Sequence, residues 1–303
     1  MSLFAPPELI RTEVFAEVPA QLRKSGTPPE RLAAGKGPIP AGCFLEGPAF
    51  DREGSLYMVD LAFGRIFKVS KDKKFSVAAE YAGEPNGLAI HKDGRIFIAD
   101  HKLGILALDP KSGDVVPVVS RYHQQGFKGV NDLFFDLHGN LYFTDQGVTD
   151  LADPTGCVYK FADGVLHQLA NCIPSPNGLV LHNNVLYVAV TRANAVWRLP
   201  FAPDGTVVRM GVQIQMSGGR GPDGMAMDEA GGLVVAHPDM GAVWVFDHRG
   251  EPKLRVQSCA SDMVTNVCFG GADRKSLFIT DSGAGAILTA RVQTPGTVLY
   301  SHT

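Results

Sequence analysis

The sequence predicts an all-β chain folded as a six-bladed β-propeller with a central metal site. One pattern recurs six times: a polar residue, an apolar strand, a tight turn and a second strand, as in PNGLAIHKDGRIFIAD and VNDLFFDLHGNLYFTD. We call the polar residue the anchor of its repeat. The anchors are Glu46, Asn86, Asn131, Asn177, Asp223 and Asn266. They lie 40, 45, 46, 46 and 43 residues apart, a period typical of propeller blades with four strands each.

The anchors are expected to converge at one end of the central channel. In each blade the strand after the anchor should be the innermost, and a two-strand hairpin returns the chain to the level at which it began. Residues that end the second strand should therefore lie on the same face. They are Asp60, Asp100, Asp145, Asp281 and His237, with the apolar Val190 in the fourth repeat. The turns at the other end, such as KDG and LHG, are ordinary hairpin turns.

The length and the flanking segments fit one propeller domain over residues 1–303. The stretch LIRTEVFAEV, residues 9–18, alternates like a strand and is expected to pair with C-terminal strands and close the ring. Residues 20–42 are dense in Pro and Gly and lack an alternating apolar pattern. We interpret them as an irregular insertion near the channel mouth.

Composition excludes several classes of partner. A net charge of −3 gives no electrostatic basis for binding nucleic acid or an anionic membrane. No apolar run approaches the roughly 20 residues of a membrane helix. The N-terminus lacks a basic segment followed by an apolar core, and the five cysteines show no C-x-x-C spacing. Free thiols in a reducing cytoplasm are therefore expected.

The anchors could be simple turn residues, because Asn-Gly and Asp-Gly often begin strands. Turn chemistry does not require a Glu before Gly47-Pro48, however, nor the same residue classes in register in every blade. Carboxylates and carboxamides are hard oxygen donors that suit Ca²⁺. The carboxylates of Glu46 and Asp223 would balance its charge. The sequence thus predicts bound Ca²⁺, with Mn²⁺, Mg²⁺ or Zn²⁺ as alternatives.

The EGP opening, the ND dipeptide, PNG and PDGM together resemble the senescence marker protein, gluconolactonase and luciferin-regenerating enzyme family. The resemblance spans roughly residues 44 to 290. It implies a six-bladed propeller lactonase that uses a divalent metal, similar in site design to diisopropylfluorophosphatase. By the same resemblance the metal ligands fall on Glu46, Asn131, Asn177 and Asp223. A neighbouring Asp of the family falls on Asp132.

One departure from the family bears on the substrate. Sugar lactonases carry an Arg two residues before the ND Asn, and here that position is Gly129. A less hydroxylated lactone is therefore expected. Several residues are placed near the site as candidate substrate contacts, with solvated loops or blade packing as the alternative. They are Asn86, His101, Phe127, His237 and Asn266.

The function predicted from the sequence is a metal-dependent lactonase in which activated water opens a small lactone. Asp223 is the first candidate for the base that takes a proton from water, followed by Asp132 and Asp145. A metal-dependent organophosphate or aryl-ester hydrolase is the enzymatic alternative. The second alternative is a non-catalytic calcium-binding scaffold, because a fold alone does not establish chemistry.

Overall fold

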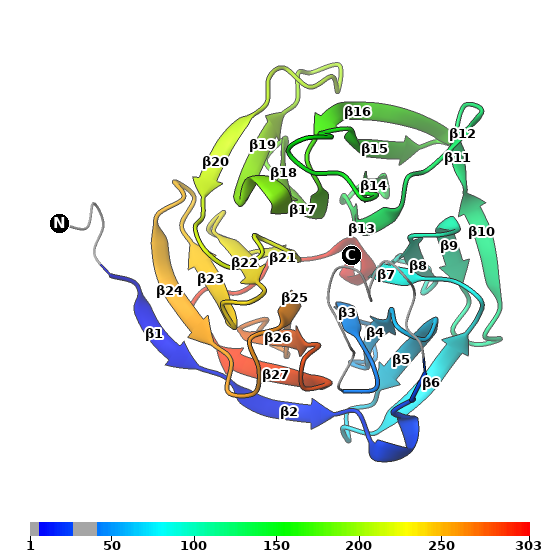
Figure 1. Ribbon diagram of the computed structural model, residues 1–303, viewed down its shortest axis with the longest axis vertical. Coiled ribbons are helices and arrows are strands. Elements are labelled where there is room, and N and C mark those ends of the chain that lie inside the picture. The colour runs from blue at the N-terminus through cyan, green and yellow to red at the C-terminus, as the bar shows by residue number, and fades with distance from the viewer. Residues whose placement is uncertain (1–5, 27–40) are drawn as a thin grey trace.

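Six β-sheets surround a central axis in the computed structural model, which describes residues 6–26 and 41–303 (Figure 1). This arrangement confirms the predicted six-bladed propeller. In each sheet the strands follow one another outward from the axis, so the first strand of every repeat is innermost, as predicted. The inner strands contact their neighbours in an unbroken ring, β3–β7–β13–β17–β21–β25–β3.

The first three blades are formed as follows. Blade one contains β3 (Leu45–Phe50), β4 (Leu56–Asp60), β5 (Arg65–Val69) and β6 (Phe75–Glu80). Blade two contains β7 (Pro85–Ile90), β8 (Ile96–Asp100), β9 (Gly104–Leu108) and β10 (Val115–Val119). Blade three contains β13 (Val130–Phe135), β14 (Leu141–Asp145), β15 (Gly156–Ala162) and β16 (Val165–Ile173). A two-stranded ribbon, β11 (Arg121–Tyr122) and β12 (Gln125–Gly126), precedes blade three.

The last three blades complete the ring. Blade four contains β17 (Pro176–His182), β18 (Val185–Val190), β19 (Ala195–Pro200) and β20 (Gly211–Gln215). Blade five contains β21 (Met225–Met227), β22 (Leu233–His237), β23 (Ala242–Phe246) and β24 (Pro252–Gln257). Blade six contains β25 (Val264–Gly270), β26 (Ser276–Asp281) and β27 (Ala286–Arg291).

The N-terminal segment closes the ring, as the alternating pattern predicts. Its second strand, β2 (Glu13–Glu17), pairs antiparallel with β27 and supplies the fourth strand of blade six. Its first strand, β1 (Glu8–Arg11), was not anticipated as a separate element. It runs parallel to β24 as a fifth strand of blade five. The segment thus ties two blades together and covers two sheet edges.

Helical structure among the described residues consists of three short 3₁₀ turns, η1 (Ala20–Leu22), η2 (Thr191–Ala193) and η3 (Tyr300–His302). None of the described helices has the length and apolarity to cross a bilayer. The predicted insertion at 20–42 lies mostly outside the described residues; η1 and Arg23 belong to its described part. The Arg23 guanidinium donates to the carbonyls of Val18, Ala41 and Ala284. All five cysteines are free.

Both faces of the middle strands are covered by neighbouring blades, so these strands are apolar up to the polar residue that ends them. All five residues of β4, LYMVD, are buried, as are those of β8, IFIAD. Threonine hydroxyls join adjacent blades near the axis. Thr144 of blade three donates to the carbonyl of Asn177, and Thr265 of blade six donates to that of Leu45. These bonds fix the relative heights of the inner strands.

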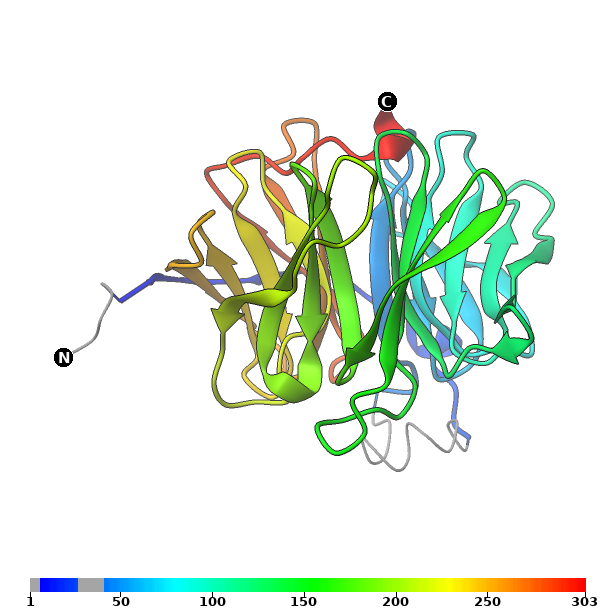
Figure 2. The same cartoon turned by 90° about the horizontal axis from the view of Figure 1, so that it is seen from above.

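The two ends of the channel carry different structures. Figure 2 shows the C-terminus on one face of the disc, together with turns that join successive strands, and the long connection between β14 and β15 on the opposite face. We call the face at which the inner strands begin the anchor face, and the opposite one the turn face. Val148 and Leu151 in the β14–β15 connection are exposed on the anchor face.

Candidate metal centre

All six anchors are buried at the start of an inner strand. Their exposed fractions run from 3 to 7 %. Glu46, Asn86, Asn131 and Asn177 are the second residues of β3, β7, β13 and β17, Asn266 is the third of β25, and Asp223 lies two residues before β21. Buried carboxylates and carboxamides are costly without hydrogen bonds or a cation. Their shared burial therefore argues against simple solvated turns.

A local irregularity directs the anchors. In five blades the pairing of the first two strands shifts register at the anchor, between Glu46 and Ala49, Pro85 and Gly87, Val130 and Leu133, Pro176 and Leu179, and Val264 and Asn266. Such bulges bend a strand and turn a side chain away from the regular pleat. Sequence reasoning did not anticipate them. In four of these five blades the signal was the Gly or Asp that follows the anchor, whereas Asn266 is followed by Val267.

The glycine after an anchor allows close approach between blades. A Cβ at Gly224 would lie 2.0 Å from the Asn266 amide carbon, and a Cβ at Gly87 would lie 2.6 Å from Asp132 Oδ1. Both distances are too short for any other residue. The PNG and PDG motifs are thus required by the packing of polar side chains around the axis.

One hydrogen bond crosses the channel. Asn266 Nδ2 of blade six donates to Asp132 Oδ2 of blade three at 3.4 Å, although these blades lie on opposite sides of the ring. Asn86 Nδ2 donates to the carbonyl of Asn131 at 3.2 Å. The other oxygen of Asp132 accepts from the Leu133 amide. Burial raises the pKa of Asp132 to about 7, and the nearby Asp223 carboxylate adds to the rise.

A hydrogen-bonded chain fixes the orientation of Asn131. Gln146 Nε2 donates to Ser175 Oγ at 2.9 Å, which leaves Gln146 Oε1 to accept Asn131 Nδ2 at 2.7 Å. Asn131 Oδ1 is then a buried acceptor with no hydrogen-bond donor among the described residues. Sequence reasoning missed Gln146, which follows the second strand of blade three, and Ser175, which holds Gln146 in place, because neither belongs to the repeated pattern.

That buried oxygen fits a cation. The other members of the predicted set, the carboxylates of Glu46 and Asp223 and the carboxamide of Asn177, are buried and are all hard donors. The described residues contain no group of three or more His, Cys, Asp or Glu that could hold a metal alone. A metal here must therefore use amide oxygens. The donor chemistry favours Ca²⁺ or Mg²⁺ over a soft-ligand metal.

Five of the six residues that end the second strands, all except Val190, are polar and contact loops. Each is buried and holds the loop that leads into its own inner strand. Asp60 accepts from the Phe44 amide, Asp100 from Glu84, Asp145 from Lys128 and Gly129, and Asp281 from Ser261, while His237 Nε2 bonds the Gly218 carbonyl. These contacts tie the end of each second strand to the loop that precedes the inner strand of the same blade.

Asp145 and His237 are the two predicted site residues that end second strands. Both oxygens of Asp145 accept backbone amides, and burial raises its pKa. His237 is 1 % exposed, and burial lowers its pKa. Nothing in the structure shows either one acting on substrate. A catalytic Asp145 and a substrate-binding His237 stay predictions.

His101 and Phe127 lie near the anchor face in different surroundings. The imidazole of His101 occupies the space beside Gly129, where a Cβ would lie 2.1 Å from its Cε1. Phe127 packs edge-on against Phe143 and Tyr159, with centroids 5.3 and 5.4 Å apart. Phe127 is therefore part of the blade-three core, with only part of its ring exposed. Contact of either residue with substrate remains a prediction.

The chain matches the family described as "SMP-30/Gluconolactonase/LRE-like region" over residues 44–283, and it belongs to that family. This confirms the resemblance found in the anchors. Among curated proteins it is similar to "Lactonase drp35" of Staphylococcus aureus strain MW2. The two are 32% identical over 226 residues, which cover 70% of this chain and 68% of the relative.

Solved structures show the same fold. A gluconolactonase from Xanthomonas campestris has a TM-score of 0.73 at 24% identity and covers 84% of this chain and 86% of its own. A calcium-binding regucalcin from Agrobacterium tumefaciens has a TM-score of 0.76 at 19% identity and covers 98% and 100%. These likenesses establish a shared propeller architecture.

Proposed function

We propose that this protein is a metal-dependent lactonase, with Ca²⁺ held by Glu46, Asn131, Asn177 and Asp223. The observation that carries the proposal is the buried Asn131 Oδ1, which has no donor among the described residues and is fixed in place by Gln146. An amide oxygen held in this way is preorganised for a cation. Similarity to a protein named lactonase at 32% identity supports the reaction class.

When bound, a divalent cation supplies the positive charge that polarises an ester carbonyl and stabilises developing negative charge. The protein's own residues supply the rest. Asp223 is proposed to accept the proton of the attacking water, with Asp132 as the other candidate for this role. Asn266 holds Asp132 through the bond that crosses the channel, and the Asn86 bond to β13 holds the Asn131 backbone.

The proposed substrate is a small lactone with few hydroxyl groups. Gly129 offers no side-chain donor, and the His101 imidazole fills the space beside it. An imidazole can bond one substrate oxygen at most through each nitrogen, whereas a polyhydroxylated sugar needs several partners. Buried substrate hydroxyls left without partners cost on the order of 1–3 kcal/mol each.

The test combines metal content with activity in a single set of preparations. Glu46→Gln should lose most bound metal and most lactonase activity, because one of two carboxylates is removed. Glu53→Gln, an exposed acid on the turn face, is the matched control and should change neither. Elemental analysis and hydrolysis of γ- and δ-lactones, aryl esters and phosphotriesters are measured before and after chelation. Full metal occupancy and activity in Glu46→Gln would show that the assignment is wrong.

Chelation should also lower the melting temperature of the wild-type protein. A ligand bound only by the native state stabilises it by mass action, by about 2.7 kcal/mol at a hundred times its dissociation constant. Adding Ca²⁺, Mn²⁺, Mg²⁺ or Zn²⁺ back in turn ranks the metals. If phosphotriesters are turned over faster than every lactone, the protein is an organophosphate hydrolase and the lactonase proposal is wrong.

A further inference from the structure

A large cavity occupies the turn-face half of the channel. Its volume is about 780 Å³, within the range of about 300–1,000 Å³ typical of small-molecule sites. The wall consists of inner-strand side chains below the anchors. They include Ala49, Leu88, Ile90, Leu133, Leu179, Met225, Met227 and Val267. Asp132 and Asn266 form the inner end, where they are bonded to each other. Apart from this end the inner-strand wall is apolar, and it includes the aromatic rings of Phe50, Phe134 and Phe269.

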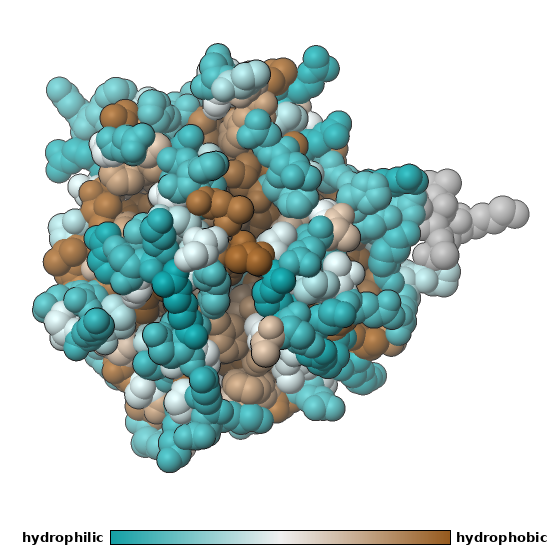
Figure 3. Space-filling view, turned by 180° about the vertical axis from the view of Figure 1, so that it is seen from behind, coloured by the Kyte–Doolittle hydropathy of each residue, from teal (hydrophilic) through white to brown (hydrophobic). Residues whose placement is uncertain are grey.

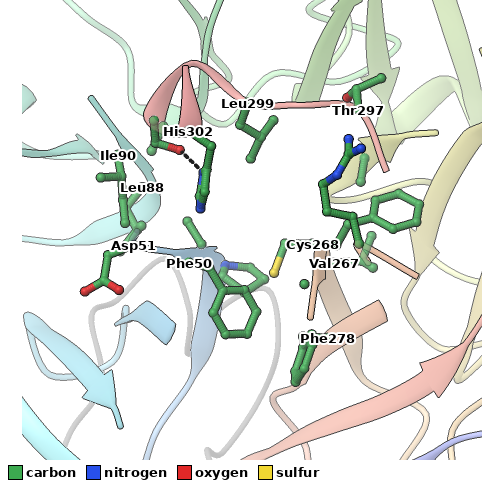
Figure 4. A pocket seen from close by; sticks show the side chains of 18 of the residues that line it. Phe50, Asp51, Leu88, Ile90, Val267, Cys268, Phe278, Thr297, Leu299 and His302 are labelled. Atoms are coloured by element: carbon green, nitrogen blue, oxygen red, sulfur yellow. Dashed lines mark hydrogen bonds between the residues drawn. The ribbon is translucent and has the colours of Figure 1, made fainter. Parts of the chain in front are cut away.

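A segment near the C-terminus crosses the mouth of this cavity. We call residues 295–302 the strap. On one side, Thr297 N donates to the Met227 carbonyl and Arg274 Nη1 to the Gly296 carbonyl. On the other side, Arg52 Nε donates to the Ser301 carbonyl at 2.7 Å. In Figure 4, Leu299 and His302 project into the same opening as Phe50 and Val267. The strap therefore roofs the mouth from blades five and six to blade one.

Apolar side chains gather around this mouth. Figure 3, seen from behind Figure 1, shows brown side chains at the centre of this face, surrounded by hydrophilic ones. An apolar cavity of this kind takes up apolar molecules, because water gains few hydrogen bonds there. The cavity is therefore suited to a hydrocarbon chain.

The rim supplies one cation without a partner. Beside the strap the lining continues between blades one and six, past Phe15, Gly54, Lys71 and Gly271. Lys71 forms no hydrogen bond or ion pair with any residue that the structure describes. By contrast, Arg52 and Arg274 hold the strap, and Arg274 also pairs with Glu229 at 2.7 Å. Two acids lie at the same rim: Asp51, which accepts the Ser55 amide, and the exposed Glu53.

We propose that the cavity binds an aliphatic monocarboxylate, with its chain along the channel and its carboxylate at Lys71. The apolar wall matches the hydrocarbon chain, and Lys71 is the cation at the rim that has no partner among the described residues. The reverse orientation would place a carboxylate against Asp132, which like-charge repulsion disfavours. This site lies at the opposite end of the channel from the proposed metal centre. It does not depend on the proposed lactonase activity.

Calorimetric titration of the full-length protein with decanoate tests the proposal, in buffer with and without chelator. Decanoate should bind saturably in both. Lys71→Glu should weaken decanoate at least tenfold and leave 1-decanol unchanged. Lys111→Glu, an exposed lysine at another turn of the same face that does not line the cavity, should leave both ligands unchanged. The charge change is identical in the two variants, so the difference isolates the position of the cation.

A channel-filling variant tests the position of the chain. Ala89 and Ala226 line the cavity and are partly exposed in it, so Ala89→Leu with Ala226→Leu should abolish binding of both decanoate and decanol. Should the double variant not fold, Ala226→Leu alone provides the test. Absence of saturable decanoate binding by the wild type overturns the proposal. So does decanoate binding that survives channel filling or that is insensitive to Lys71→Glu.

Discussion

Two sets of buried polar residues occupy the anchor-face half of the propeller. The first set, the anchors, begins the innermost strands; the second ends the strands next to them. Asn86 and Asn266 in the first set bond residues of other blades. Asp60, Asp100, Asp145 and Asp281 in the second set instead accept backbone amides of their own blade's entry loop. Position along a hairpin thus separates side chains suited to chemistry from side chains that hold loops.

The contrast is sharpest at Asp60, so its substitution should have the largest effect on stability. Asp60 Oδ2 binds the buried Arg65 at 2.6 Å, and the two side chains are 0 and 1 % exposed. Asp60→Asn leaves the guanidinium buried without its counter-charge, which should lower the free energy of unfolding by about 3–5 kcal/mol. Denaturant titration measures this.

The control is the exposed ion pair of Arg291 with Asp273. Asp273→Asn should leave the unfolding free energy almost unchanged, because exposed pairs are screened by solvent. If Asp60→Asn were as stable as the control, the second set would not be structural, and the comparison would fail.

Asp223 should show the opposite behaviour, with activity lost and folding kept. Asp223→Asn retains an oxygen for the metal but removes the proposed base, so kcat should fall by roughly 10²-fold. Metal content must be measured on the same preparation, so that lost metal is not mistaken for a lost base. Near-normal turnover with full metal content would remove Asp223 from that role.

Asp132, which follows an anchor, and Asp145, which belongs to the second set, are the two other candidates for the base, and they are expected to behave differently. Asp145→Asn should lower stability, since its two oxygens accept the amides of Lys128 and Gly129, and it should leave kcat close to wild type. Asp132→Asn should reduce kcat by less than Asp223→Asn if Asp132 only orients water or substrate. Comparing kcat with melting temperature for both variants decides between them. If Asp132→Asn or Asp145→Asn abolished turnover while Asp223→Asn remained active, the base would be the residue changed in the inactive variant.

Much of this architecture could be predicted from the sequence, because it depends on a repeated local pattern. The repeat period predicted six blades, and the alternating pattern in residues 9–18 predicted that an N-terminal strand, β2, closes the ring. The loop contacts of Asp145 could not be predicted, because hairpin geometry places this residue on the anchor face without revealing which amides it meets. The same holds for Gln146: its partner Asn131 is set by a bulge, and a bulge depends on packing between blades.

Substrate preference should follow the environment of Gly129. The ratio of kcat/KM for an alkyl or aryl lactone to that for gluconolactone should exceed one. Each sugar hydroxyl left without a hydrogen-bond partner should cost on the order of 1–3 kcal/mol of binding free energy. His101→Ala should narrow this ratio, because it opens the space beside Gly129 to a hydrated sugar. His138→Ala, at a distant turn, is the control. A clear wild-type preference for gluconolactone would contradict the predicted specificity.

The smallest effect is expected at His237, the one member of the second set that is not a carboxylate. Its Nε2 bonds the Gly218 carbonyl, and its Nδ1 is buried without a partner among the described residues. Burial lowers its pKa below the value of about 6.5 for an unfolded chain. Asp239 opposes this shift and Arg255 reinforces it. The unfolded state therefore binds the proton more tightly, and the stability contributed by His237 is present above pH 6.5 and is lost as the pH falls.

His237→Gln should remove this dependence, because a carboxamide can still donate to Gly218 and does not titrate. The difference in unfolding free energy between wild type and variant should be largest near pH 7.5 and should shrink toward pH 5. Buried carboxyl groups such as Asp100 have raised pKa values, so their contribution to stability falls as the pH rises. This contribution is the same in wild type and variant and cancels in the difference. A difference that stays constant with pH would show that His237 does not titrate in this range. A difference that grows on acidification would show that the pKa of His237 is raised by folding and not lowered.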